Sequence, residues 1–170
     1  MEFDVEVVLD CDIVSTLAKI DGISLLVEIF EDIRIVIPNA VYVELLEAER
    51  IGFTFTEKIF QSQIEITTML DSELIDFKNI VKNKRIHHGE AEGIAIARNR
   101  NGVFLTNDRI AVRFCEQNDV KVLDLKDILR MAARKKVINE TEMVKLIKDI
   151  EVKDNTIIVE KDEILQEYEN

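Results

Sequence analysis

The chain has 170 residues, of which 47% are hydrophobic, and a formal net charge of −12 at pH 7. This length suits one domain with its own core, and no apolar run reaches the roughly 18 residues of a membrane-spanning helix. The first residues also lack the basic and then apolar order of a signal peptide. We therefore expect a cytoplasmic protein with no membrane segment.

The acidic charge argues against binding of nucleic acid by overall electrostatic attraction, because such binding usually needs a basic face. The excess of acids is uneven, because residues 139–170 hold ten acids and four bases. Cys11 and Cys115 lie in apolar stretches and are predicted to be free thiols. With two histidines and no Cys-x-x-Cys pair, the sequence offers no zinc cluster, so any metal must be held by oxygen ligands.

Strands and helices alternate along the predicted secondary structure. Short runs rich in valine and isoleucine indicate buried strands, and apolar residues spaced by three and four indicate helices. In chain order we first expect a strand at 6–9, helices at 13–20 and 23–30, a strand at 33–37 and a helix capped by Asn39. A short helix and a short strand at 64–67 follow, and then a helix capped by Asp71 or Ser72 that runs to about residue 84 and another helix after Gly89. The last elements of this part are a strand at 103–106, a helix at 109–118, a strand at 120–123 and a helix at 126–135. The alternation predicts a three-layer α/β fold, with a mostly parallel sheet of four to five strands between layers of helices.

The alternating elements occupy residues 1–138, which we take as the domain. Residues 139–170 form an acidic C-terminal extension with a predicted helix at 141–150 and a predicted short strand at 156–159. We expect this extension to pack on the domain.

Four acids fall where ligands gather in such a sheet, beyond the carboxyl ends of the strands. Asp10 ends the first strand, and Asp108 follows the strand at 103–106. Glu44 and Glu90 lie early in helices that begin near the same edge. Clustered carboxylates repel one another unless a cation compensates them, and Mg²⁺ and Mn²⁺ prefer oxygen ligands. The sequence thus predicts one or two such ions, which would activate water to hydrolyse a phosphodiester.

Four motifs resemble those of the PIN-domain family over approximately residues 5–138. They are Val8-Leu9-Asp10-Cys11-Asp12, the segment from Ile37-Pro38 to Val43-Glu44-Leu45, the helix beginning Gly89-Glu90-Ala91-Glu92, and Leu105-Thr106-Asn107-Asp108. The resemblance implies a single-strand-type ribonuclease dependent on Mg²⁺ or Mn²⁺, often the toxin of a bacterial or archaeal toxin–antitoxin pair of the Vap type. In such pairs a partner protein blocks the site, and family members commonly form homodimers.

The resemblance implies that Asp10, Glu44, Glu90 and Asp108 are the catalytic acids. The metal ligands are then Asp10, Asp108 and either Glu90 or Glu92, with Glu90 favoured. Asp12 stands where the family usually has Ser, Thr or Asn, so it could bind Asp10 as a protonated acid or act as a further ligand. Thr106 and Asn107 are expected to support the site.

Basic residues near the acids are candidates for holding RNA phosphates. These are Lys84, Arg85, His88, Arg109 and Arg113. For Lys84 and Arg85, compensation of the dipole of the preceding helix is an equally good explanation.

Two other functions fit parts of the sequence. Asp10-Cys11-Asp12-Ile13-Val14 also matches the Asp-x-Asp-x-Val opening of haloacid-dehalogenase-type phosphatases, in which Asp10 would be the nucleophile. That interpretation leaves Glu44 and Glu90 unexplained. A non-catalytic interaction protein on the same fold is the second alternative. All four acids are present, so we prefer the nuclease.

Overall fold

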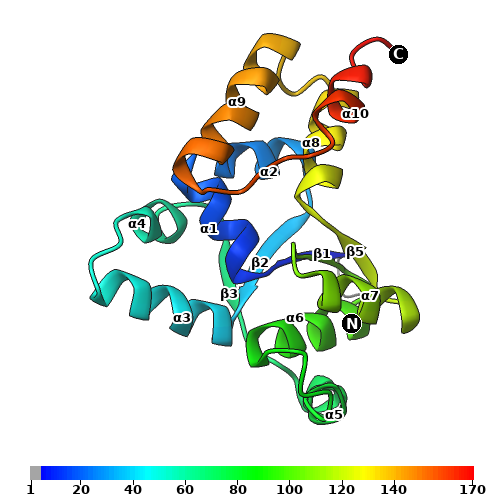
Figure 1. The fold of residues 1–170 in the computed structure, drawn as a ribbon. Helices are drawn as coiled ribbons and strands as arrows, with labels where there is room; N and C mark the ends of the chain where they lie inside the picture. Colours follow the sequence, from blue (N-terminus) through cyan, green and yellow to red (C-terminus); the bar gives the residue numbers. More distant parts are fainter. Residues whose placement is uncertain (1–4) are drawn as a thin grey trace.

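A parallel sheet of five strands in the order β3-β2-β1-β4-β5 lies at the centre of the protein (Figure 1). The computed structural model describes residues 5–170, so the first four residues, where we expected no signal peptide, lie outside it. The strands are β1 (Glu6–Leu9), β2 (Arg34–Pro38), β3 (Glu65–Thr67), β4 (Val103–Leu105) and β5 (Lys121–Leu123). All four pairings between them are parallel. The predicted α/β fold and its sheet are confirmed.

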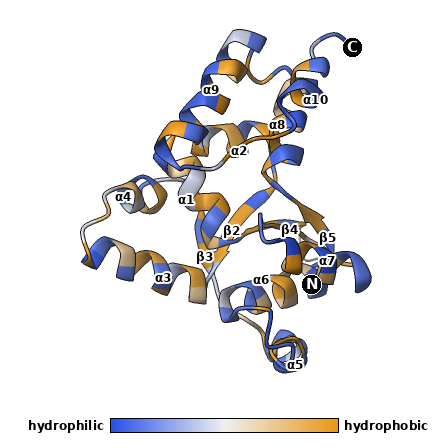
Figure 2. Ribbon diagram, in the orientation of Figure 1, coloured by the Kyte–Doolittle hydropathy of each residue, from blue (hydrophilic) through white to orange (hydrophobic). Residues whose placement is uncertain are grey.

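Helices cover both faces of the sheet, because successive residues of a strand point to opposite faces. On β1, Val7 and Leu9 belong to one core and Val8 to the other, and all three are fully buried. Over the first face lie α1 (Cys11–Lys19), α2 (Ile23–Ile29), α3 (Asn39–Arg50), α4 (Phe55–Phe60), α8 (Leu125–Arg134), α9 (Glu140–Lys153) and α10 (Lys161–Gln166). Over the second lie α5 (Asp71–Ile80), α6 (His88–Asn99) and α7 (Arg109–Gln117). Figure 2 shows the apolar residues gathered on the strands and on the inner sides of these helices.

The strand order places the middle of the sheet where the chain changes direction. From β1 the chain proceeds to β2 and β3 on one side, and it then crosses to β4 and β5 on the other. In open α/β sheets, ligands bind at this switch point, beyond the carboxyl ends of the strands. The ends of β1 and β4 are therefore the place to look for a site. Within residues 5–170, no helix is both long and apolar enough to cross a membrane.

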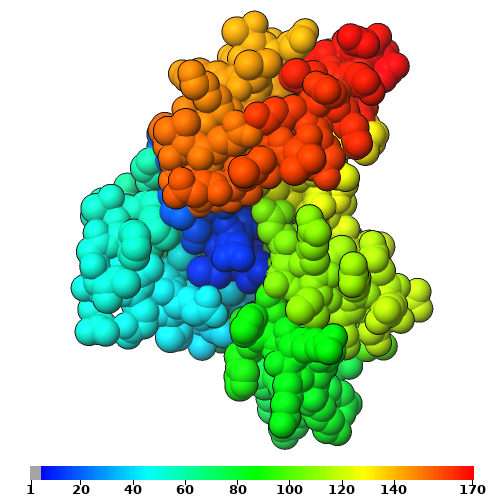
Figure 3. Space-filling view, in the orientation of Figure 1, coloured from blue at the N-terminus to red at the C-terminus, as the bar shows by residue number. Residues whose placement is uncertain are grey.

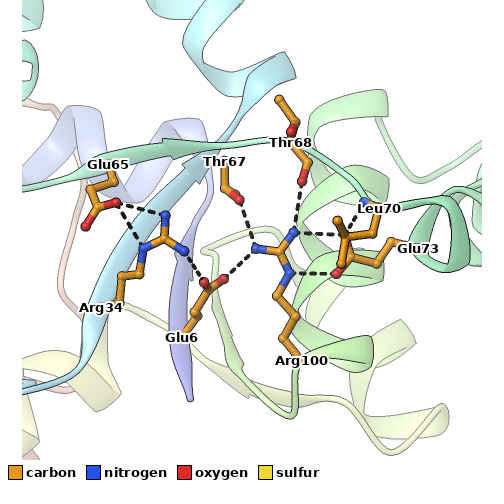
Figure 4. A network of polar contacts seen from close by, with 8 residues as sticks. All are labelled: Glu6, Arg34, Glu65, Thr67, Thr68, Leu70, Glu73 and Arg100. Atoms are coloured by element: carbon orange, nitrogen blue, oxygen red, sulfur yellow. Dashed lines mark hydrogen bonds and ion pairs between the residues drawn. The ribbon is translucent and has the colours of Figure 1, made fainter. Parts of the chain in front are cut away.

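A buried ion network joins the start of β1 to α5 and α6 (Figure 4). Arg100 donates to Glu73 Oε1 at 2.6 Å and to Glu6 Oε2 at 2.9 Å, and its side chain is 6% exposed. It also donates to the Thr67 hydroxyl and the Thr68 carbonyl, and its hydrogen bond to Glu73 raises its pKa. Arg34 donates to the other oxygen of Glu6. Each buried charge here has a partner of opposite sign.

Helices α9 and α10 of the C-terminal extension pack against α1 and α8. Asp154, which follows α9, accepts hydrogen bonds from the Thr16 hydroxyl and the Lys19 ammonium, both at 2.7 Å. Burial opposes ionisation of Asp154, but these bonds outweigh it and lower its pKa. Near the end of the chain, Glu167 pairs with Arg130 and Arg134, whose hydrogen bonds lower its pKa to about 2. The middle and the C-terminal end of the extension are thus fixed to the first helical layer.

The predicted strand at 156–159 is wrong. Residues 155–158 have no regular structure, only Ile158 is buried among them, and α10 follows instead. The β-branched run suggested a strand, but the segment lies over helices, where no strand edge is available for pairing.

Some predicted helix limits also differ. Helix α5 ends at Ile80 rather than near residue 84, because polar residues 82–85 turn back and the Asn83 side chain accepts the N–H of Arg85. The residue that caps α3 is Pro38 rather than Asn39, and α5 is capped by Leu70.

Candidate active site

A cleft of about 460 Å³ lies at the carboxyl ends of β1 and β4. Its lining contains five carboxylates, a thiol and two imidazoles, from Asp10, Cys11, Asp12, Glu44, His87, His88, Glu90 and Asp108. In Figure 3 the blue N-terminal segment is visible at the centre, between the cyan α3 region, the green α6 and α7 region and the orange C-terminal extension. The backbone N–H of Asp10 donates to the Leu105 carbonyl at 2.9 Å, which ties the ends of the two strands together.

Asp10 is held at both carboxylate oxygens. Oδ1 accepts the N–H of Cys11 at 2.7 Å, and Oδ2 accepts the hydroxyl of Thr106 at 2.8 Å. Thr106 is fully buried and in turn accepts the N–H of Asp108 at 3.1 Å. Thr106 therefore binds Asp10, a role that the sequence left open for Asp12. Asp12 is exposed and contributes its charge to the cleft instead.

Asp108 is the residue that begins α7. Its Oδ1 accepts the N–H groups of Ile110 at 2.8 Å and Ala111 at 2.9 Å, which satisfies two donors at the start of the helix. Asn107 does not line the cleft; its side chain accepts the N–H of Leu125, at the start of α8. Asn107 thus supports the loop that carries Asp108 into the cleft.

Glu90 and Glu92 face different neighbours, because residues two apart on a helix point about 200° apart. Glu90 lines the cleft, and its Oε2 accepts the N–H of His87 at 2.9 Å. Glu92 does not line the cleft, and its Oε2 accepts the N–H of Ala40 at 2.9 Å. The geometry assigns Glu90 to the carboxylate cluster and Glu92 to the start of α3, where a negative charge is favourable.

Glu44 reaches the cleft from α3 and lies against the start of α6. A Cβ added at Gly89 would be 2.9 Å from Oε1 of Glu44 and 3.6 Å from Val41. A side chain at position 89 would therefore displace the Glu44 carboxylate. The absence of a Cβ at Gly89 lets α3 and α6 bring two acids to one place.

The electrostatics of the cleft favour uptake of positive charge. Burial raises the pKa of Asp10 to about 6, and the neighbouring charges of Asp12 and Glu44 add to this effect. Burial likewise raises the pKa of Glu90 to about 7, helped by Asp10 and Asp108 and opposed by the His87 N–H. None of the residues that line the cleft is Lys or Arg. The carboxylates are held close together without a fixed cation.

Oxygen donors of this kind fit Mg²⁺ or Mn²⁺. Within residues 5–170, no three His, Cys, Asp or Glu side chains are arranged closely enough to hold one ion as they stand. The Cys11 thiol is a poor ligand for either ion, and burial together with the Glu44 charge raises its pKa to about 12. The chemical type of these oxygen donors fits a hard cation, but their present arrangement does not hold one.

The expected RNA-binding residues fall into three places. His88 lines the cleft and packs edge-on against Phe77, with ring centroids 5.8 Å apart. Lys84 and Arg85 are exposed on the turn before α6 and do not line the cleft. Arg109 and Arg113 line a neighbouring groove. Sequence reasoning did not single out Cys11 for this cleft, although it directly follows Asp10.

The fold and the cleft define a class of protein: a parallel α/β domain with acids gathered at its switch point. A model of the DUF3368 PIN-domain family matches residues 6–166, so the chain belongs to the PIN-domain family. This membership also rules against the phosphatase alternative. Among curated proteins, no sequence relative was found.

Solved structures share the fold at low sequence identity. VapBC-1 from nontypeable Haemophilus influenzae has a TM-score of 0.55 at 15% identity, covering 71% of this chain and 98% of that one. VapBC2 from Rickettsia felis, solved bound to a DNA fragment from their promoter, has a TM-score of 0.54 at 15% identity with the same coverages. PAE2754 from Pyrobaculum aerophilum has a TM-score of 0.54 at 16% identity, covering 76% of this chain and 90% of that one.

Proposed function

We propose that the protein is a metal-dependent ribonuclease that hydrolyses RNA phosphodiester bonds in the carboxylate cleft. The observation that carries this proposal is the convergence of Asp10, Glu44, Glu90 and Asp108 in one cleft. They come from four separate elements of a PIN-domain fold, and two of them have raised pKa values. Crowded acids without a basic partner reduce stability, and a binding site for a cation explains why they are retained.

In this proposal Asp10, Glu90 and Asp108 hold Mg²⁺ or Mn²⁺. A bound divalent cation lowers the pKa of water and compensates the negative charge that develops on a phosphodiester. Thr106 keeps Asp10 oriented, and the start of α6 keeps Glu90 oriented. Glu44 lines the same cleft, and in this proposal its carboxylate would orient the attacking water. Hydrolysis of this type leaves a 3′-hydroxyl and a 5′-phosphate.

RNA reaches the cleft despite the net negative charge of the protein, because cations lie beside the acids. Arg109 follows Asp108 directly, and Arg113 lies one turn further along α7. Both are exposed, and neither forms an ion pair within the described residues. We assign phosphate contacts to these two arginines and to His88 at the cleft itself.

The test is cleavage of a mixed pool of RNA with Mg²⁺ or Mn²⁺. We expect the Asp10→Asn and Glu90→Gln variants to lose activity by about 100-fold or more, as expected when a metal ligand is removed. Glu44→Gln should also lose activity, whereas Glu47→Gln, one turn further along α3 and paired with Arg50, is the matched control. Full activity in both Asp10→Asn and Glu90→Gln would contradict the assignment of ribonuclease activity to the carboxylate cleft. Inactive wild type with either ion would favour the non-catalytic alternative.

We also propose a protein partner of the antitoxin kind and pairing as a homodimer. The similar structures carry the name VapBC, which motivates a partner chain. Exposed apolar residues of α3 and the loop after it offer a surface for such contacts: Val43, Leu46, Ile51 and Phe53. Light scattering after size exclusion tests the homodimer, because a single chain has a mass of 19.6 kDa. A mass of one chain at all concentrations would contradict it.

A further inference from the structure

A second hollow opens directly beside the carboxylate cleft. It has a volume of about 400 Å³ and lies between α7, the start of α8 and residues 155–160, which we call the strap. Asn107 and Arg109 line it, and Asp108, the residue between them, lines the cleft. The loop at residues 107–109 therefore contributes side chains to both the cleft and the groove.

The walls of the groove differ in chemistry. The wall from α7 carries Arg109 and Arg113, spaced by one helical turn, with Val112 between them. The wall from the strap carries Thr156 and the aliphatic side chain of Ile157, which is 77% exposed. The groove also carries Lys126 and three carboxylates, from Glu116, Asp124 and Glu160. Guanidinium groups suit phosphates, and an apolar side chain suits the face of a base.

The strap is held in place although it has no regular secondary structure. At one end the Thr156 hydroxyl donates to Asp154 at 2.6 Å, and Asp154 is itself bound to α1. In the middle Ile158 is buried, and at the other end Glu160 pairs with Lys126 of α8 at 3.9 Å. A fixed strap keeps Ile157 presented to the groove, so a ligand need not order this wall when it binds.

We propose that this groove holds one nucleotide of single-stranded RNA next to the scissile phosphate, with its phosphate on Arg109 and Arg113 and its base against Ile157. This inference rests on the proposed ribonuclease function and deepens it by assigning a nucleotide subsite to the groove between α7 and the strap. A base can lie against the strap only when it is unstacked and unpaired, which a duplex does not allow. The C-terminal extension thereby selects single strands.

Binding measurements in the Asp10→Asn background, which prevents cleavage, test the groove directly. The probe is a fluorescein-labelled single-stranded oligoribonucleotide of mixed sequence, followed by anisotropy with Mg²⁺. Ile157→Glu should weaken binding by about tenfold, because it removes a base contact and places a carboxylate near phosphates. Val152→Glu is the matched control, since Val152 is an exposed aliphatic residue of the same extension, 68% exposed, that does not line the groove.

Equal affinities of the two variants for single-stranded RNA would overturn the proposal, as would the absence of measurable binding by the Asp10→Asn protein. Equal affinities would instead favour a groove that holds a segment of a partner protein. Oligoribonucleotides carrying 4-thiouridine at successive positions should crosslink to the strap from one position only. If no position gives a crosslink, the proposal is contradicted. In the cleavage-competent protein, Ile157→Glu should raise KM by about tenfold with little change in kcat.

These readouts separate the two ideas. If wild type fails to cleave RNA but the strap still crosslinks and Ile157→Glu still weakens binding, the ribonuclease function fails and the groove stands. If wild type cleaves RNA and Ile157→Glu behaves like Val152→Glu, the groove fails and the function stands.

Discussion

Two clusters of buried acids lie at opposite ends of β1. At its start, Glu6 and Glu73 are bound by Arg100, and Arg34 binds Glu6 as well. Just past its end, Asp10 and Glu90 have raised pKa values and only hydroxyl and backbone N–H groups as hydrogen-bond donors. The first cluster is compensated within the protein, whereas no Lys or Arg lines the cleft that holds the second. The difference separates acids that hold the fold together from acids that we propose to bind a cation.

The largest expected effect comes from breaking the balanced cluster. Arg100→Met should lower the free energy of unfolding by about 3–5 kcal/mol, because Glu6 and Glu73 would stay buried without a partner. Urea unfolding at pH 7 measures this. Arg98→Met is the control, since Arg98 forms an exposed ion pair with Asp76 at 3.4 Å that should contribute less than about 1 kcal/mol. Similar losses in both variants would contradict the distinction.

A cation should supply what the second cluster lacks. Mn²⁺ at about a hundred times its dissociation constant should raise the free energy of unfolding by about 2.7 kcal/mol, because it binds the folded chain. Asp10→Asn should abolish most of this gain, and Glu47→Gln should keep it. Thermal unfolding with and without Mn²⁺ gives the answer, and an unchanged melting temperature in wild type would argue against a metal site.

Without metal, the acids of the cleft should reduce stability in a pH-dependent way. The pKa of Glu90 rises from 4.5 to about 7 on folding, so the folded protein binds its proton more tightly than the unfolded chain does. The contribution of this proton to the free energy of unfolding is fully present below pH 4.5, decreases as the pH rises, and is lost above about pH 7. Glu90→Gln removes the unfavourable free energy of an ionised carboxylate buried among other acids. It should therefore stabilise the metal-free protein by about 2 kcal/mol at pH 8, and by much less at pH 4.

Chemical unfolding of wild type and Glu90→Gln at the two pH values checks this prediction. Glu47→Gln, on the exposed side of α3, should be neutral at both. A variant that is less stable than wild type at pH 8 would show that Glu90 is compensated within the protein.

The smallest effect is expected at Glu92. Glu92→Gln keeps an oxygen for the Ala40 N–H. Burial raises the pKa of Glu92 and the N–H groups at the start of α3 oppose this, so loss of the charge should change the free energy of unfolding by less than about 1 kcal/mol. The stabilisation by Mn²⁺ and the cleavage of RNA should stay at wild-type levels. Loss of the Mn²⁺ effect in this variant would move Glu92 into the metal site.

The sequence predicted the parts of the fold that depend on local pattern. Valine-rich runs located the strands, and because ligands gather beyond strand ends, the strand positions alone placed Asp10 and Asp108 at one edge of the sheet. Their catalytic roles, and those of Glu44 and Glu90, stay predictions. The choice of Glu90 over Glu92 needed the rotation of α6 relative to α3, which the spacing of residues on one helix does not give.

Features built from distant residues were missed. Arg100 looks like any exposed base after a helix, yet it binds Glu6 and Glu73, which lie 94 and 27 positions away. The groove likewise depends on residues 107–126 meeting residues 156–160. The strand predicted at 156–159 failed for the same reason, because what decides a strand is the surface on which it packs.

The contact between Thr16 and Asp154 has a consequence for the order in which the molecule is assembled. The two residues are 138 positions apart, whereas all five carboxylates of the cleft lie within the first 108 residues. Because the ribosome makes the chain from its N-terminus, every acid of the cleft is translated before Asp154 and the strap. The length of the chain between Thr16 and Asp154 adds little to the entropic cost of their contact, because doubling the length of a closed loop costs only about 0.6 kcal/mol. The acids of the cleft and the α7 wall of the groove are thus translated before the strap that forms the other wall.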